Sequence, residues 1–266
     1  MNAIVRAAKL SAAVVVAAFF AVTPTVAAEI KVMVSGGFSA AYRALGPQFE
    51  RETGHTLSMA AGPSMGETPQ AIPNRIDRGE PVDVVIMVGD ALGKLIERGK
   101  VVPSSRVDLA RSSIAMAVRA GDPKPDISTL EAFKRALLEA KSIAYSDSAS
   151  GIYLSTTLYA KLGIAEQVAG KSRKVRGPPS GEPVAAVVAR GEAEIGFQQV
   201  SELIHVPGVT FVGAIPAELQ QDTFFSAALA NAVRQPEAAG ALLRFLASSE
   251  AAPAISRAGL APLSGR

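Results

Sequence analysis

The chain has 266 residues, no cysteine and a formal net charge of +3; two of its 27 Lys and Arg residues lie in residues 1–28, which leaves 25 against 24 acidic residues. This balance excludes the basic footprint of a nucleic-acid-binding protein, and no run of like charge predicts binding to a membrane surface. The lack of cysteine excludes disulfides and a lipid attachment point.

Residues 1–28 are predicted to be an export signal rather than part of the fold. Arg6 and Lys9 form a basic start, residues 10–22 form a short apolar run, and residues 26–28 have the small side chains of a cleavage site. A membrane anchor needs about 20 apolar residues, so this run is too short. We therefore expect cleavage near Ala28 and a periplasmic location, where disulfides are permitted but not required.

The rest of the chain alternates strand-like and helix-like segments. Short apolar runs predict strands at 30–34, 57–60, 82–88, 113–118, 143–145, 194–198, 209–212 and 223–230. Helical spacing predicts a helix through 42–49, further helices at 91–99, 130–140, 152–162 and 183–190, and two more at the C-terminus. This order is typical of an α/β protein built on parallel sheets.

Three strand-to-helix connections are rich in glycine and serine: 35–39 (SGGFS), 62–66 (GPSMG) and 146–151 (SDSASG). In open α/β sheets, ligands bind beyond the carboxyl ends of strands, where helix N-termini offer free N–H groups to an anion. Glycine lets the backbone approach such a ligand closely. The three connections therefore predict a cleft for an oxyanion or a carboxylate. None matches a phosphate-loop or dinucleotide fingerprint, and no metal-ligand cluster occurs, so neither a cofactor nor a metal is expected.

Five segments point to a known family. They read EIKVMVSGGFSAAYRALGPQFERETG, RGEPVDVVIMVGD, ASGIYLSTTLYAKLG, VVARGEAEIGF and LLRFLASSEAAPAISRAGLAP. In these segments, and over essentially all of the exported part, the chain resembles the periplasmic molybdate-binding components of ABC importers, which are type II periplasmic binding proteins. The resemblance implies two α/β lobes, each with a mainly parallel sheet flanked by helices, joined by two crossing strands. It places lobe 1 in 29–113 plus 229–266, lobe 2 in 114–228, and the crossings near 114–118 and 224–229.

The resemblance also suggests which residues bind the ligand. Ser64 and the serine-rich third connection match the family, whereas Gly37 stands where its members usually have serine, and Gln198 and Gln199 follow a strand that lacks their tyrosine. Side chains alternate along a strand, so at most one of the two glutamines is expected to face the cleft. The full predicted set is Ser35, Gly36, Gly37, Phe38, Ser39, Ser64, Met65, Gly66, Ser146, Ser148, Ser150, Gly151, Tyr153, Gln198 and Gln199.

The resemblance implies a periplasmic solute-binding protein that delivers a small anion to an ABC permease in the inner membrane, and we expect a monomer. The departures from the family favour an organic carboxylate over a molybdate-like oxyanion, because a tetrahedral oxyanion needs a small, tight ring of donors. The alternative is an enzyme. The same superfamily includes aconitate isomerases, which interconvert cis- and trans-aconitate on this fold.

An isomerase needs a group that moves a proton. The candidates are Tyr153 and Asp147, although packing between the lobes and helix capping are the competing structural roles of these residues. His55 and His205 are predicted to be solvated loop residues. Since the sequence contains no distinctive acid–base motif, it favours the binding protein over the isomerase.

Overall fold

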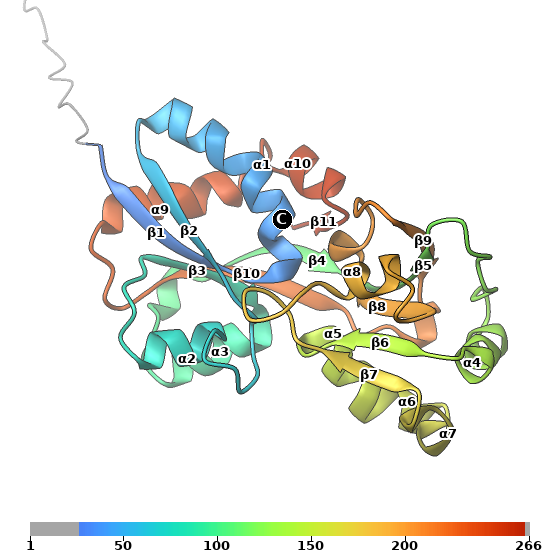
Figure 1. Cartoon of the computed structure of the whole chain (residues 1–266). Coiled ribbons are helices and arrows are strands. Elements are labelled where there is room, and N and C mark those ends of the chain that lie inside the picture. The colour runs from blue at the N-terminus through green and yellow to red at the C-terminus, as the bar shows by residue number, and fades with distance from the viewer. Residues whose placement is uncertain (1–26, 264–266) are drawn as a thin grey trace, which may run out of the picture.

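The structure is a computed structural model that describes residues 27–263. Apart from its last two residues, the predicted export signal at 1–28 lies outside the described residues. Figure 1 shows two lobes side by side, each built on one sheet with helices against it. Within 27–263, no helix is both long enough and apolar enough to cross a membrane.

The first lobe contains a six-stranded sheet in the order β11-β4-β10-β3-β1-β2. Its strands are β1 (Glu29–Val34), β2 (Thr56–Ala61), β3 (Val84–Val88), β4 (Val107–Ser112), β10 (Thr223–Leu229) and β11 (Ala261–Pro262). β1 is parallel to β2 and β3, whereas β10 is antiparallel to β3 and β4. The helices of this lobe are α1 (Gly36–Thr53), α2 (Ile72–Asp77), α3 (Gly89–Glu97), η1 (Pro103–Ser105), α9 (Pro236–Leu246) and α10 (Ala252–Arg257).

The second lobe contains a five-stranded sheet in the order β7-β6-β8-β5-β9. Its strands are β5 (Ile114–Arg119), β6 (Ile143–Ser146), β7 (Ser172–Val175), β8 (Ile195–Gln199) and β9 (Val209–Ala214). β6 is parallel to β7 and β8, and β5 is antiparallel to β8 and β9. The helices are α4 (Leu130–Glu139), α5 (Ala149–Tyr153), η2 (Leu154–Leu158, a π-helical turn), α6 (Tyr159–Lys161), α7 (Ala165–Ala169), α8 (Val184–Ala189) and η3 (Val200–Glu202).

The predicted two-lobed α/β fold is confirmed, and its strands form where apolar runs meet covered sheet faces. All five residues of β3 are buried, as expected of a parallel strand with packing on both faces. Each sheet is mixed rather than mainly parallel, because β5 and β10 run against their neighbours. The parallel strands end at the junction of the lobes, so the connections that follow them are brought together there.

The chain changes sheet twice. β4 and β5 are separated only by Ser113, and β9 and β10 are separated by 215–222, which include η4 (Ala217–Leu219). The predicted limits of lobe 2, 114–228, take in most of β10, but β10 pairs with β3 and β4 of the first sheet. By strand pairing, the second change of sheet therefore lies between β9 and β10.

Candidate functional site

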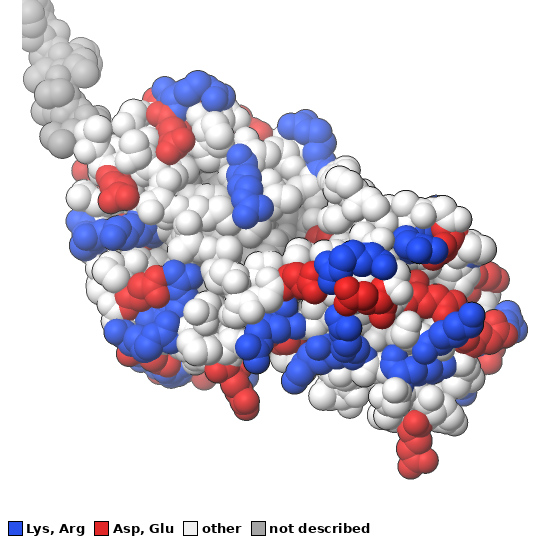
Figure 2. Space-filling view, in the orientation of Figure 1, with Lys and Arg blue, Asp and Glu red and all other residues white. Residues whose placement is uncertain are grey.

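A cavity of about 240 Å³ lies between the two sheets. Its lining follows the carboxyl ends of β1, β2 and β3 in the first lobe and of β6, β7 and β8 in the second. Figure 2 shows a hollow, mostly uncharged surface where the lobes meet. This is the position in which open α/β sheets place their ligands.

The first-lobe wall of the cavity includes Ser35, Gly36, Gly37 and Arg43. Ser35 is the N-cap of α1, but its hydroxyl makes no cap bond, and the buried Oγ has no partner within the described part of the chain. N–H groups in the first turn of a helix have no acceptor within the helix. This wall therefore offers hydrogen-bond donors and the positive end of an 18-residue helix.

The two glycines of this wall make room for side chains from distant segments. A Cβ on Gly36 would lie 2.5 Å from Oε1 of Glu202, and a Cβ on Gly37 would overlap the ring of Phe225. The Ser201 hydroxyl also donates to the Gly37 carbonyl over 2.7 Å. The SGGFS connection therefore lets the second lobe approach the start of α1 closely.

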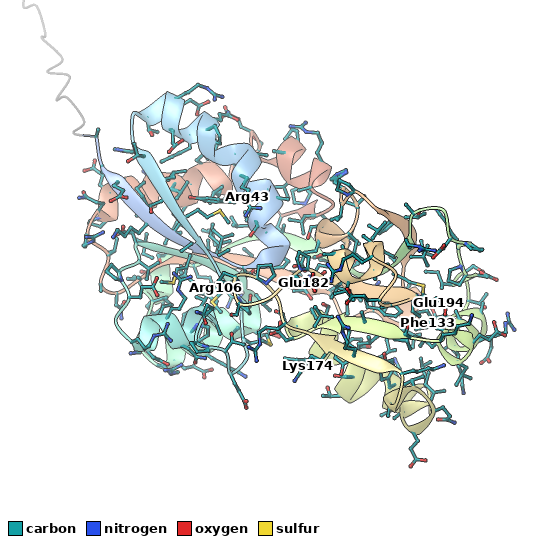
Figure 3. All side chains as sticks on the ribbon, viewed as in Figure 1. Arg43, Arg106, Phe133, Lys174, Glu182 and Glu194 are labelled. Atoms are coloured by element: carbon teal, nitrogen blue, oxygen red, sulfur yellow. The ribbon has the colours of Figure 1, made fainter. Side chains whose placement is uncertain are left out.

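Arg43 brings the positive charge of the first-lobe wall. It lies on α1, two turns beyond Gly36, and its side chain is exposed (Figure 3). None of the ion pairs found in residues 27–263 includes it. A guanidinium in this state is available to bind a carboxylate through two hydrogen bonds.

The second-lobe wall of the cavity is formed by Ser146–Ser150, Gln198, Gln199 and Glu202. Ser148 is the N-cap of α5 and, like Ser35, makes no side-chain cap bond. The hydroxyls of Ser146 and Ser150 bond each other over 3.1 Å, and Oδ1 of Asp147 accepts the Gly177 N–H over 3.0 Å. Among these serines, Ser148 is the one whose hydroxyl makes no hydrogen bond to another described residue.

Both glutamines line the cavity, so the prediction that at most one would do so is wrong. β8 ends at Gln199 at the edge of the cavity, so side chains from both faces of the strand reach it. Nε2 of Gln198 donates to Glu202 over 2.9 Å, and Nε2 of Gln199 donates to Oγ1 of Thr223 over 3.0 Å. The two Oε1 atoms are buried without a partner among the described residues, and buried polar atoms normally have one. They are thus positioned to accept hydrogen bonds from a ligand or from water.

Glu202 lies in η3, directly after β8; it is half-buried, and its carboxyl packs against Gly36 of the first-lobe wall. Burial raises the pKa of the Glu202 carboxyl to about 7, and the Asp147 carboxylate acts in the same direction. Hydrogen bonds from Gln199 and Gln198 oppose the rise in pKa. At neutral pH this carboxyl is therefore present in both its protonated and its ionised form.

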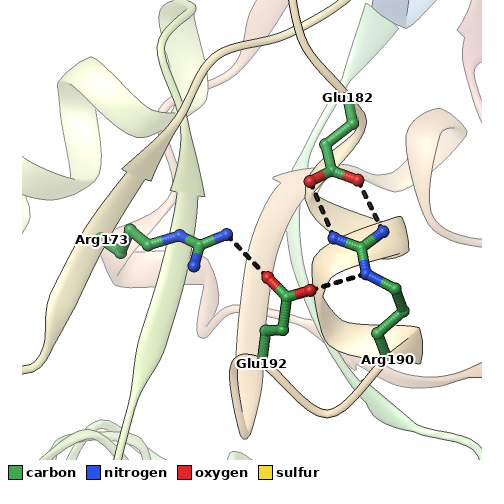
Figure 4. Close-up of polar contacts among 4 residues, drawn as sticks. All are labelled: Arg173, Glu182, Arg190 and Glu192. Carbon is green, nitrogen blue, oxygen red and sulfur yellow. Dashed lines mark hydrogen bonds and ion pairs between the residues drawn. The ribbon is translucent and has the colours of Figure 1, made fainter.

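The segment after β7 completes the second-lobe side of the cavity with Gly177, Pro178 and Pro183. A surface ion-pair network holds this segment against α8 (Figure 4). Glu182 accepts two hydrogen bonds from Arg190, at 2.6 and 2.8 Å, and Nε of Arg190 contacts Glu192 at 2.7 Å. Arg173 on β7 pairs with the other oxygen of Glu192 at 3.2 Å.

Some of the residues predicted to bind the ligand lie outside the lining. Phe38 is in the first-lobe core, with its ring centroid 6.3 Å from that of Phe225. The Tyr153 hydroxyl donates to the Leu219 carbonyl over 2.7 Å, and Tyr153 and Met65 line a different hollow. Gly66 and Gly151 are also absent from the lining. The members that do line the cavity are Ser35, Gly36, Gly37, Ser39, Ser64, Ser146, Ser148, Ser150, Gln198 and Gln199.

Sequence reasoning missed Arg43, Ser201 and Glu202. Helical spacing could have found Arg43, because it falls on the face of α1 that begins at Gly36 and Ala40.

His55 was expected in solvent, but it is buried and its Nδ1 accepts the Ala28 N–H over 3.2 Å, which ties the start of β1 to the turn after α1. His205 is exposed, as predicted. In 27–263 no group of three or more His, Cys, Asp or Glu residues is arranged to hold a metal ion.

Comparison with known proteins adds two kinds of relative. The chain is 52% identical over 251 residues to aconitate isomerase from Pseudomonas sp, covering 93% of this chain and 94% of that protein. It is 28% identical over 240 residues to the molybdate-binding protein of Azotobacter vinelandii, covering 88% and 90%. The solved periplasmic molybdate-binding protein from Azotobacter vinelandii superposes with a TM-score of 0.70 at 22% identity, over 87% of this chain and 98% of that one.

A model of the bacterial extracellular solute-binding protein family matches residues 30–261, which is nearly all of the described chain. The periplasmic molybdate-binding protein of Azotobacter vinelandii shares this fold. The segments on which the resemblance was based therefore identified the correct group. The chain belongs to the family of bacterial extracellular solute-binding proteins.

Proposed function

We propose that the protein is an exported isomerase that interconverts the cis and trans forms of a small unsaturated tricarboxylate of the aconitate type. The observation that carries this proposal is the 52% identity to aconitate isomerase across 93% of the chain. The identity to the molybdate-binding protein of Azotobacter vinelandii is 28%. The chemistry of the cavity supports the same choice.

The first-lobe wall suits a ligand with several carboxylates. Arg43 offers a bidentate contact, and Ser35 with the start of α1 offers neutral donors at a positive helix end. Donors in such a position also stabilise the charge that develops on a carboxylate when a neighbouring carbon loses a proton. The wall therefore has the groups needed to hold the substrate and to stabilise the transition state.

The test is to incubate the purified exported chain with trans-aconitate and to follow the olefinic and methylene signals by proton NMR. We expect cis-aconitate to appear, and the reverse reaction to give the same final ratio of isomers. Heat-treated protein is the control. Binding of trans-aconitate without formation of the cis isomer would refute the proposed activity.

A second function, delivery of a carboxylate to an ABC permease, is favoured by the family match and by the molybdate-binding relatives. It predicts binding without turnover. A ligand at 100 times its dissociation constant stabilises a protein by about 2.7 kcal/mol, which a thermal shift assay detects readily. A screen of molybdate, sulfate and mono- to tricarboxylates, combined with the NMR assay, separates the two functions.

A further inference from the structure

Interconversion of cis- and trans-aconitate requires a proton carrier, and this inference rests on the proposed function. The double bond changes geometry when a proton leaves the terminal methylene carbon and a proton is added to the carbon at the other end of the three-carbon unit. The carrier must lie within about 2.6–3.2 Å of the reacting carbons, directly or through one water. It must also be able to exist in both protonation states at the working pH.

The titratable side chains that line the cavity are Arg43, Asp147 and Glu202. A guanidinium stays protonated in proteins, so Arg43 cannot act as the base. Both carboxyls accept a hydrogen bond from the protein, Asp147 from the Gly177 N–H and Glu202 from Nε2 of Gln198, but Glu202 is the one that lies against Gly36 at the start of α1. Glu202 remains as the group that can take up and return a proton.

The position of Glu202 fits this role. Its Oε1 packs against Gly36 at the start of α1, beside the place where a substrate carboxylate would be held, and the same Oε1 accepts a hydrogen bond from Nε2 of Gln198 over 2.9 Å. We propose that Glu202 is the catalytic residue that carries the proton between the two terminal carbons of the substrate. Arg43 on α1 and Asp147 before α5 are the charged groups that face the same space.

The step balances without any further reactant. The ionised Glu202 carboxylate takes a proton from the methylene carbon, and the electrons of that C–H bond form the new double bond to the central carbon. The former double-bond electrons move to the other terminal carbon, whose carboxylate carries the developing charge. Glu202 then returns the proton to that carbon, so nothing is oxidised or reduced and the carboxylate is regenerated.

The raised pKa of the Glu202 carboxyl, about 7, suits this exchange. General acid–base catalysis is most efficient when the pKa of the group lies near the operating pH. Since the free enzyme must hold Glu202 ionised to begin the reaction, kcat/KM should rise with pH and level off above about 7.

The test compares the wild type with Glu202→Gln, an isosteric variant that keeps a hydrogen-bonding partner for Gln198. We expect kcat for trans-aconitate to fall about 100-fold or more, while affinity for trans-aconitate is kept or increases, because a negative charge leaves an anion site. Glu250→Gln, a change at an exposed turn residue, is the matched control and should behave as the wild type.

The kinetics and affinity of the Glu202 variants decide whether Glu202 is the catalytic residue. A Glu202→Gln enzyme with kcat within about threefold of the wild type, or one that has lost binding together with turnover, would overturn it. If Glu202→Gln does not fold, Glu202→Asp replaces it, because a shorter acid should lower kcat but keep the pH dependence, and an unchanged kcat would again overturn the assignment. A wild type that binds trans-aconitate but never isomerises it refutes the proposed function instead.

Discussion

The two walls of the cavity are built alike but differ in charge. Each begins with an N-cap serine, Ser35 or Ser148, whose hydroxyl makes no cap bond. The first-lobe wall adds the cation Arg43, whereas the second-lobe wall adds the carboxyls of Asp147 and Glu202. A carboxylate facing a bound anion opposes binding, so a site built only to hold an anion gains nothing from these two carboxyls. Under the proposed function, the first-lobe wall holds the ligand and the second-lobe wall exchanges a proton with it.

The largest expected effect concerns the geometry of the second-lobe wall. A Cβ on Gly151 would overlap the backbone carbonyl of Ser146, which cannot move without breaking the end of β6. We expect Gly151→Ala to destabilise the fold by about 3 kcal/mol, a fall of roughly 6–12 °C in Tm for a chain of this size. Gly170→Ala is the control, since nothing lies near the added methyl. Equal Tm values for the two variants would show that this wall is adaptable rather than rigid.

The next effect distinguishes structural from ligand-facing serines. Ser64 is fully buried, and its hydroxyl accepts the Val88 N–H over 3.0 Å. Ser64→Ala leaves that N–H unsatisfied, so we expect a loss of about 1–3 kcal/mol in unfolding free energy by denaturant titration. Ser148→Ala, which breaks no such bond, should leave stability unchanged and weaken trans-aconitate binding. The reverse pattern would mean that Ser148 is a structural residue.

A smaller effect tests the charge of the first-lobe wall. Arg43→Gln should weaken trans-aconitate binding about tenfold by calorimetry, because a charge-assisted hydrogen bond is lost at an exposed position. The loss should shrink as salt is added, since exposed charges are screened. Arg51→Gln, at the far end of the same helix, is the control and should bind normally. Equal affinities for both variants would remove Arg43 from the site and leave the first-lobe wall without a charged side chain that binds the ligand.

The strands that were predicted and those that were missed differ in burial. β3 was found because all its residues are apolar and both its faces are covered. β4 and β7 were missed because they carry charged residues that reach solvent, and a sheet-edge strand such as β7 needs little apolar sequence to pair. Hydrophobic patterning therefore identifies strands made only of apolar residues more readily than strands that also carry charged residues.

The candidate site also shows how far sequence patterns can predict a structure. Ser35 and Ser148 were predicted because glycine and serine after a strand mark a helix start in the sequence itself. Glu202 was missed because its role depends on facing Gly36, a residue of the other lobe. The two-glutamine prediction failed because alternation along β8 holds within the strand but not at its last residues, where both side chains reach the cavity. Local signals predict the loops of a site, and only the packing of lobes shows which distant side chains join them.

The smallest expected effect tests whether the second-lobe wall depends on the surface ion pairs that Arg190 makes with Glu182 and Glu192. Arg190 binds both Glu182 and Glu192, but all three side chains are exposed, and exposed ion pairs contribute little to stability. Arg190→Gln should therefore lower Tm by no more than about 2 °C, with Lys94→Gln on α3 as a control of equal charge.

The pH dependence of the Tm difference between the wild type and Arg190→Gln shows whether the ion pair with Glu182 causes that difference. Arg190 lowers the pKa of the Glu182 carboxyl, so the pair stabilises the fold above the ordinary glutamate value of about 4.3 and loses its effect as the pH falls through the lower folded-state pKa. The Tm difference should thus disappear in acid and in high salt. Affinity for trans-aconitate should change less than about twofold, because Asp147 and Gly177 still hold the inner side of the segment. A large loss of affinity in Arg190→Gln would instead show that the proton-exchanging wall is positioned from the surface, whereas the first-lobe wall is positioned by its own helix.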